Sequence, residues 1–334
     1  MTILGIETSC DETSAAVVKN GREVLSNIIA SQIDVHAPFG GVVPELAARK
    51  HIESIGFIVD QALKDANITI SDIDAYAVAN GPGLAGALLV GLNYAKGLAY
   101  AGGKPLIGVH HIEAHVCANF LGVSEGELQP PFLSLVVSGG HTSILAVDDY
   151  DTYRIVGCTR DDAAGEAFDK TARILGLPYP GGPHIDKLST VGNANAIAFT
   201  RAKMPGFDFS FSGLKTAVKQ YHAKNPDTPI EDIAASFQKS AADVLVANTI
   251  AACTQEGYDT IVLAGGVACN NGLRNAMATA CEGNGLRLFM PQPIFCTDNA
   301  AMIACRGYYR LQSNPSGDEL SLNAFPGRMV SAQH

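Results

Sequence analysis

The sequence contains no CxxC pair, although it has eight cysteines among its 334 residues. Zinc ribbons bind their metal through such closely spaced pairs, so this class of site is disfavoured. A secretory leader is missing as well, because the N-terminal MTILGIETSC has no basic region followed by an apolar run. We therefore expect reduced thiols in a cytoplasmic protein.

Long uncharged apolar runs are also absent, so we expect no membrane-spanning helix. The apolar stretch at 81–103 is rich in glycine and carries Lys96. Basic residues are few, since 23 Lys and Arg face 33 Asp and Glu and give a net charge of −10. This balance argues against strong autonomous binding to nucleic acid, although a local basic groove or a positively charged partner would still permit it.

The chain has ample apolar material, and its length suits two domains. Hydrophobic residues make up 47% and charged residues 17%, as in a globular protein. Two segments with the pattern strand, small polar turn, strand begin at Thr2 and Phe132. Two segments with the pattern buried strand, glycine turn, helix begin at Ile73 and Tyr258.

This ordered repetition predicts two duplicated α/β lobes with a nucleotide-binding cleft between them, and chance similarity is the alternative. We expect one lobe at 1–130 plus about 300–334, and the other at 131–300. A helix is predicted from Pro44 and another from Ile230 to near Gly257, because apolar residues recur there at helical spacing. The tail from Asn314 reads as irregular.

The hexapeptide HHIEAH at 110–115 is a candidate metal site. His111 and His115 are four residues apart, so both imidazoles lie on one face of a helix and can share a metal. Metallopeptidases of the HExxH type need a glutamate directly after the first histidine, and Ile112 stands there. We expect His110 and Glu113 to be supporting or surface residues; the alternative for the whole stretch is a solvated polar helix end.

A third ligand is needed, and Asp298 in FCTDNAAMIA is a candidate. It follows an apolar run and precedes a predicted helix, where an aspartate could also serve as a helix cap. The residues alone leave both roles open.

Several motifs occur in order and together resemble one family: GIETSCDETSAA, GGVVPELAARKH, NGPGLAGALLVG, HHIEAH, VVSGGHT, GEAFDKTARILGLPYPGGP, DFSFSGLKTAV, GGVACNNGLR and FCTDNAAMIA. The chain resembles the universal tRNA threonylcarbamoyladenosine biosynthesis transferase subunit family, once labelled O-sialoglycoprotein endopeptidase, over about residues 2–310. The resemblance implies the actin/Hsp70/sugar-kinase (ASKHA) type of fold. It also implies transfer of a threonylcarbamoyl group from threonylcarbamoyl-adenylate to N6 of the adenosine 3′ of the anticodon, in tRNAs that read codons beginning with A.

The resemblance also implies a ligand set. Asp298 would complete a site for one divalent metal, zinc or iron(II), with His111 and His115, leaving positions open for substrate. An adenylate or ATP-type nucleotide would contact the segment formed by Val136, Val137, Ser138, Gly139 and Gly140, for which a plain hairpin turn is the alternative. Asn270 would contact the nucleoside, or merely cap a helix.

Three further residues are candidates for binding the nucleotide. Asp169 can accept hydrogen bonds from ribose hydroxyls, or pair with Arg173 four residues on. Gly182 would allow close backbone approach and Asp186 a further hydroxyl contact, although both could equally be turn and cap residues.

Asp11 and Glu12 are the candidate catalytic carboxylates, because they lie on the first hairpin turn. Either could deprotonate the adenosine amine or orient the donor, and a solvated turn is the alternative. The matching turn of the second lobe carries His141 where the first carries Asp11, so the two turns are expected to work differently.

The expected nucleic-acid partner is the anticodon loop of tRNA, and the candidate cations are Lys203, Lys215, Lys219 and Lys224. Bacterial members of the family work with an inactive paralogue of the same fold and a small ATPase, and the helix from Pro44 is expected to face the paralogue. Without it the chain could form a homodimer. Two rival functions stay open: a glycoprotein metallopeptidase, and a sugar-kinase-like or carbamoyl-chemistry ATPase on the same fold.

Overall fold

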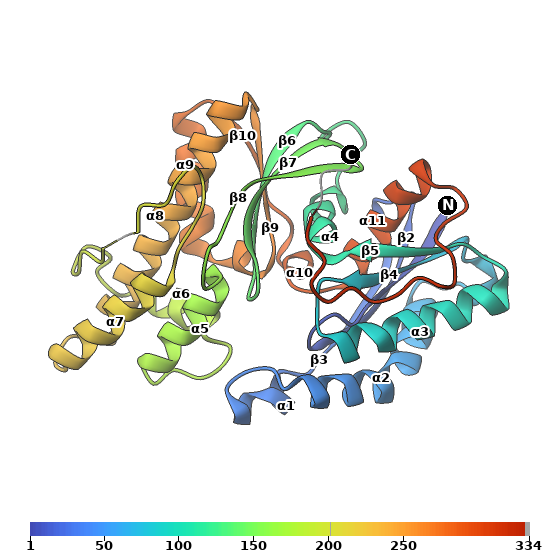
Figure 1. Ribbon diagram of the computed structural model, residues 1–334, viewed down its shortest axis with the longest axis horizontal. Helices are drawn as coiled ribbons and strands as arrows, with labels where there is room; N and C mark the ends of the chain where they lie inside the picture. Colours follow the sequence, from blue (N-terminus) through green and yellow to red (C-terminus); the bar gives the residue numbers. More distant parts are fainter. Residues whose placement is uncertain (201, 331–334) are drawn as a thin grey trace. The chain divides into compact units, whose positions relative to one another are not determined.

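The computed structural model describes residues 1–200 and 202–330, which form two compact α/β units (Figure 1). Unit 1 comprises Met1–Pro130, Asp149–Tyr153 and the residues from Pro291 onward. Unit 2 comprises Pro131–Asp148 and Arg154–Met290. Each unit is built on its own five-stranded sheet.

Unit 1 contains a mixed sheet in the order β3-β2-β1-β4-β5. Its strands are β1 (Thr2–Glu7), β2 (Glu12–Lys19), β3 (Glu23–Ser31), β4 (Ala75–Gly81) and β5 (Leu106–His110). Its helices are α1 (Ile33–His36), α2 (Pro44–Asp65), α3 (Ala85–Gly102), α4 (His111–Cys117), α10 (Pro293–Cys296) and α11 (Ala300–Ser313). The central strand β1 pairs antiparallel with β2 and parallel with β4.

The two faces of β1 carry different side chains, because successive residues of a strand point to opposite sides. Leu4 and Ile6 belong to a core cluster that also includes residues of α2 and α3. Gly5 points the other way, and a Cβ added there would lie only 2.2 Å from the carbonyl oxygen of Ala300 in α11. The close approach of α11 to β1 therefore requires glycine at position 5. This approach places the residues just before α11 beside the sheet.

Unit 2 repeats this arrangement, with the order β8-β7-β6-β9-β10. Its strands are β6 (Phe132–Val137), β7 (Thr142–Asp149), β8 (Thr152–Cys158), β9 (Thr260–Ala264) and β10 (Arg287–Phe289). Its helices are α5 (Ala164–Ile174), α6 (Gly181–Ser189), α7 (Ser212–Lys224), α8 (Ile230–Glu256) and α9 (Asn271–Gly283). Here β6 pairs antiparallel with β7 and parallel with β9, as β1 does with β2 and β4, so the predicted duplication is confirmed.

The individual elements expected from the sequence are also present. The helix from Pro44 runs to Asp65, and the helix from Ile230 ends at Glu256, where Gly257 adopts the left-handed conformation typical of a helix end. From Asn314 to residue 330 the described chain forms no helix or strand beyond a single bridge. Among the described helices, none combines the length and apolar character needed to cross a bilayer.

Candidate functional site

The two predicted metal ligands lie on α4, which begins directly where β5 ends. His111 is 7% exposed, His115 is fully buried, and the other residues of α4 are also buried. The alternative of a solvated polar helix end is therefore wrong, because α11 packs against this short helix. Glu113 is not a surface residue either: its carboxylate pairs with the buried Arg306 of α11 at 2.7 Å.

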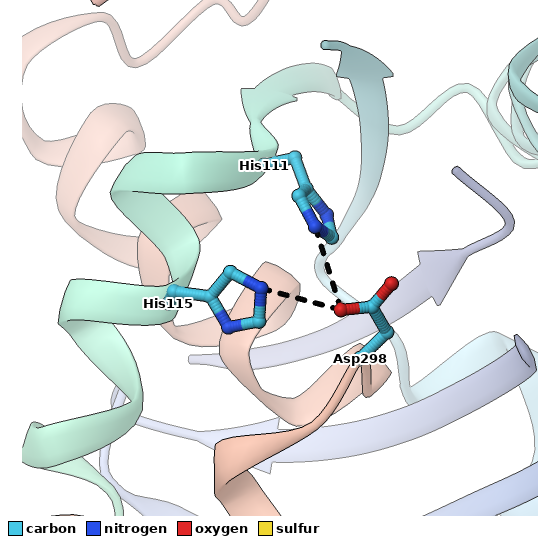
Figure 2. Close-up of side chains that lie close together, drawn as sticks. All are labelled: His111, His115 and Asp298. Atoms are coloured by element: carbon cyan, nitrogen blue, oxygen red, sulfur yellow. Dashed lines mark ion pairs between the residues drawn. The ribbon is translucent and has the colours of Figure 1, made fainter. Parts of the chain in front are cut away.

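Asp298 reaches the same point from the other end of the chain (Figure 2). Its Oδ1 lies 3.5 Å from Nε2 of His111 and 3.2 Å from Nε2 of His115. Two ligands at about 2.1 Å from one tetrahedral metal are roughly 3.4 Å apart, so this spacing suits a shared cation. Asp298 does not cap α11, because Asn299 accepts the hydrogen bond from the Met302 backbone N–H.

The chemistry of these three groups fits a divalent metal. Within the described part of the chain, Nδ1 of the completely buried His115 has no hydrogen-bond partner, and Nε2 faces only the Asp298 carboxylate at ion-pair distance. A buried polar atom without a partner costs free energy unless something else satisfies it. Two imidazoles and one carboxylate, with their donor atoms within 4.8 Å of one another, are a donor set for zinc or iron(II).

The charges of His111 and Asp298 shift each other's pKa. Burial lowers the pKa of His111, but Asp298 and Glu7 raise it more, so the net pKa lies well above the usual value. Burial raises the pKa of Asp298, whereas the two imidazoles lower it more, so this carboxyl stays ionised far below its usual range. A proton on His111 therefore competes with a metal for the same position, and metal binding should weaken as pH falls.

Glu7 is a neighbour of the site that the sequence reasoning missed. It is the last residue of β1, it is completely buried, and its Oε2 lies 3.0 Å from Nδ1 of His111. A carboxylate at the end of an otherwise apolar strand was the available signal. Its partner His111, however, is too distant in the sequence for a local pattern to predict the pair.

The two candidate catalytic carboxylates lie where β1 turns into β2. Asp11 is buried, so a fully solvated turn does not describe it, and Glu12 is half-buried at the start of β2. Burial, followed by the charges of Asp298 and Asp11, raises the pKa of Glu12 to about 10. A carboxyl held in its acid form cannot accept a proton, but a cation held by Asp298 would offset that charge and restore a base. Their catalytic role stays a prediction.

The predicted nucleotide-binding turn of unit 2 follows the last two residues of β6. The backbone N–H of Ser138 donates to the carbonyl of His141 at 2.8 Å, and its hydroxyl accepts from the His141 N–H at 3.1 Å. Gly139 and Gly140 are exposed, and an added Cβ at either would meet no described atom within 4 Å. Packing within the described structure therefore does not require glycine at these two positions.

Three other residues predicted to contact the ligand lie on α5 and α6. Two of them already form hydrogen bonds, and the third is a glycine with open space around it. Asp169 accepts a hydrogen bond from the Gly181 N–H at 2.7 Å. Gly182 has no atom within 4 Å of an added Cβ among the described residues. Asp186 accepts from the backbone and side chain of Asn271, at 3.1 and 2.7 Å, so it helps to cap α9. The cap that the sequence offered as an alternative for Asp186 is thus present.

Asn270 is the N-cap of α9. Its Oδ1 accepts from the Leu273 N–H at 2.8 Å, and its Nδ2 donates to Gln238 at 2.6 Å. Both ends of the amide are used within unit 2, so the capping alternative is confirmed. Contact with a nucleoside remains a prediction.

Comparison with known proteins assigns the family. A family model described as tRNA N6-adenosine threonylcarbamoyltransferase matches residues 23–305. The tRNA N6-adenosine threonylcarbamoyltransferase of Clostridium novyi (strain NT) is 58% identical over 97% of this chain and 96% of its own length. That of Clostridium perfringens (strain 13 / Type A) is 57% identical, with the same coverage of both chains.

Solved structures of low sequence identity share the fold. HypF from T. kodakarensis has a TM-score of 0.65 and 14% identity, covering 93% of this chain and 48% of that chain. Component A of the (R)-2-hydroxyglutaryl-CoA dehydratase from Acidaminococcus fermentans has a TM-score of 0.55 and 17% identity, covering 93% and 99%. These likenesses show the ASKHA type of fold alone. The family match and the relatives, which extend over nearly the whole chain, show that it belongs to the tRNA N6-adenosine threonylcarbamoyltransferase family.

Proposed function

We propose that the chain transfers a threonylcarbamoyl group from threonylcarbamoyl-adenylate to N6 of the adenosine 3′ of the anticodon, in tRNAs that read codons beginning with A. Family membership supports the reaction class. The observation that carries the proposal is the buried convergence of His111, His115 and Asp298, a three-ligand set that leaves positions open for a substrate.

The same site disfavours peptide hydrolysis. Ile112 occupies the position where an HExxH peptidase has its general base. The nearby Glu113 pairs with Arg306 instead of facing the imidazoles. No described carboxylate of α4 is thus available to activate a water molecule at the metal ligands.

The proposed transfer forms one covalent bond and breaks another. The N6 amine forms a C–N bond to the carbamoyl carbon, the bond from that carbon to the phosphate oxygen breaks, and AMP leaves with the electron pair. A divalent cation bound by His111, His115 and Asp298 supplies Lewis acidity and an electrostatic anchor for donor oxygens. The chain itself must accept the proton that the amine loses, and we assign that role to the turn that carries Asp11 and Glu12.

We assign the adenylate part of the donor to unit 2. Next to Ser138, the two residues Gly139 and Gly140 offer backbone N–H groups without side chains that would block approach. The remaining contacts are assigned to Asp169, Gly182, Asp186 and Asn270, together with Val136 and Val137 beside the turn. For Asp169, Asp186 and Asn270, a ligand contact would have to coexist with the hydrogen bonds that these side chains make within the unit.

We further propose that α2 and α3 form the face that binds a catalytically inactive paralogue of the same fold, or a second copy of this chain in its absence. Ile52 and Phe57 of α2 are 66% and 77% exposed, and Leu89 of α3 is also exposed. A hollow of about 730 Å³ lies between these helices and is lined mainly by apolar side chains. Exposed apolar surface of this kind is typical of protein interfaces. The small ATPase is proposed as a further partner without an assigned surface.

A reconstituted transfer assay tests the proposed function. The purified chain, loaded with zinc or iron(II) and supplied with its partner proteins, tRNA and threonylcarbamoyl-adenylate, should yield threonylcarbamoyladenosine, detected by mass spectrometry of tRNA nucleosides. ATP turnover without a modified nucleoside would favour the kinase-like alternative. Cleavage of a glycopeptide would favour the peptidase.

A further inference from the structure

Glu7 is held rigidly next to a proposed metal ligand, and no role has been given to it so far. It ends the central strand β1 and pairs in register with Ser14 of β2. The next residue, Thr8, is fixed to α3, because its hydroxyl donates to the Ala87 carbonyl at 2.8 Å and accepts from the Gly91 N–H at 3.2 Å. The Glu7 carboxylate therefore has little freedom to move.

Each oxygen of this buried carboxylate has its own partner. Oε2 lies 3.0 Å from Nδ1 of His111, and Oε1 accepts a hydrogen bond from the Ser9 backbone N–H. The Ser9 hydroxyl lies 3.2 Å from the same Nδ1. Glu7, Ser9 and His111 thus form a closed triangle of contacts on the side of the imidazole that faces away from Asp298.

The second imidazole has no such support. Nδ1 of His115 has no hydrogen-bond partner within the described residues. Its ring is placed by packing, with its centroid 4.7 Å from that of His111 in an edge-on arrangement. Of the two candidate imidazole ligands, only His111 therefore has a described carboxylate behind it, at Nδ1.

We infer that Glu7 is a positioning residue of the metal centre: its carboxylate holds a proton on Nδ1 of His111 and keeps Nε2 as the lone-pair donor that faces Asp298. A carboxylate behind a ligating imidazole fixes the tautomer and makes the ring a better donor. Through Oε1 the same side chain also fixes Ser9, two residues before Asp11. One buried carboxylate thus orients a metal ligand and the turn that carries the predicted catalytic carboxylates.

This inference rests on the proposed metal site, so the test measures metal binding directly. The chain is stripped of metal with a chelator and titrated with Co²⁺, followed by visible absorption, and then with competing Zn²⁺. We expect Glu7→Gln to bind both ions about 10- to 100-fold more weakly than the wild type, as is typical when the partner of a ligating histidine is lost. A glutamine cannot replace both carboxylate oxygens as acceptors for His111 and the Ser9 N–H, because one end of its amide is a donor.

Glu12→Gln is the matched control, because it removes a neighbouring carboxylate of the same charge cluster that makes no contact with either imidazole in the hydrogen bonds described. Its metal affinity should fall clearly less than that of Glu7→Gln, by about threefold at most, because Glu12 acts on a bound cation through charge and makes no described hydrogen bond to a proposed ligand. Equal losses in Glu7→Gln and Glu12→Gln would mean a general electrostatic effect and would overturn the inference. Unchanged affinity in Glu7→Gln would overturn it too.

Glu7 is buried in a central strand, so a second measurement uses the unaltered chain. Nitrogen-15 spectra of the histidine rings in the zinc-loaded wild type should show the His111 ring bound to zinc through Nε2 and protonated at Nδ1. Zinc on Nδ1, or an Nδ1 without a proton, would overturn the inference while leaving the metal site intact. A wild-type chain that takes up neither ion would instead overturn the proposed metal site and, with it, the role of Glu7.

Discussion

His115 and Asp298 approach each other to 3.2 Å between Nε2 and Oδ1, although one lies on α4 and the other precedes α11. The contact closes a three-residue donor set inside unit 1. It depends on α11 lying against the sheet, which in turn depends on the missing side chain of Gly5. A packing requirement in β1 therefore decides where a ligand near the end of the chain is placed.

Replacing His115 by alanine should remove the metal with little damage to the rest of the protein, because the contact of Nε2 with Asp298 belongs to the metal site and Nδ1 has no hydrogen-bond partner in the described structure. We expect metal content to fall from about one per chain to less than a tenth, and transfer activity to fall by at least about 100-fold. Elemental analysis and the tRNA nucleoside assay measure the two effects. His222→Ala, on α7 of unit 2, is the control and should keep its metal; a variant of His115 that keeps both metal and activity would refute the site.

The two glycines after Ser138 provide a test of donor binding that is separate from stability. A Cβ at Gly140 meets no described atom, so Gly140→Ala should leave the melting temperature within about 2 °C of the wild type. If the adenylate approaches this backbone, the KM for the donor should rise about tenfold or more. An unchanged KM would remove this turn from the proposed binding site.

Gly165→Ala is the contrasting variant. A Cβ there would lie 2.5 Å from the carbonyl oxygen of Ser138. We expect overpacking to cost about 1–3 kcal/mol and to lower the melting temperature, because backbone atoms cannot move aside cheaply. Calorimetry of both variants would show whether the turn is held by packing at Gly165 and left open at Gly140.

Asp161 should stabilise the start of α7 in a pH-dependent way. It accepts hydrogen bonds from the hydroxyls of Ser210 and Ser212 and from the backbone N–H of Phe211. Burial raises the pKa of Asp161, but these hydrogen bonds lower it more, so the folded pKa lies below the usual value. The stabilisation is therefore present at neutral pH and is lost as pH falls through the folded pKa.

We expect Asp161→Asn to lower the free energy of unfolding by about 1 kcal/mol at pH 7, an amount typical of a lost helix cap at an exposed position. The difference from the wild type should shrink as pH is lowered from roughly 5 to 3. Urea unfolding across this range measures it. A difference that grows on acidification would show that the carboxylate has no stabilising role.

Phe57→Asp should weaken binding of a paralogue, or of a second copy, by at least about tenfold, because it places a charge in the exposed apolar face of α2. Light scattering on mixed and single proteins measures the assembly. Val191→Asp replaces a similarly exposed apolar residue in unit 2 and should leave the assembly unchanged. Equal effects of both changes would argue against α2 as the interface.

The sequence revealed local features of the site more readily than distant ones. The spacing of His111 and His115 predicts a shared helix face, and the structure shows it. Asp298 entered only through the family resemblance, because its neighbours in the chain allow a helix cap as easily as a ligand. The structure gives the cap to Asn299.

Two buried carboxylates show why the rest could not be predicted. Glu7 and Glu113 both occur beside apolar residues, and no local sequence pattern predicts their partners, His111 and Arg306. These pairs form only when β1, α4 and α11 pack together. The fold was easier to predict, because the order of hairpin, glycine turn and helix occurs twice in the sequence. The two sheets have the matching strand order.

Because unit 1 is divided along the sequence, its two parts are synthesised before and after unit 2. Unit 2 has all of its residues once Met290 has been added, whereas unit 1 still lacks the segment from Pro291 onward. Until then the face of β1 that bears Gly5 has no α11 against it, and Asp298 does not yet exist. On the ribosome the metal centre can therefore assemble only after all of unit 2 has been synthesised, and a nascent chain that stops before Pro291 can hold no cation through these three ligands.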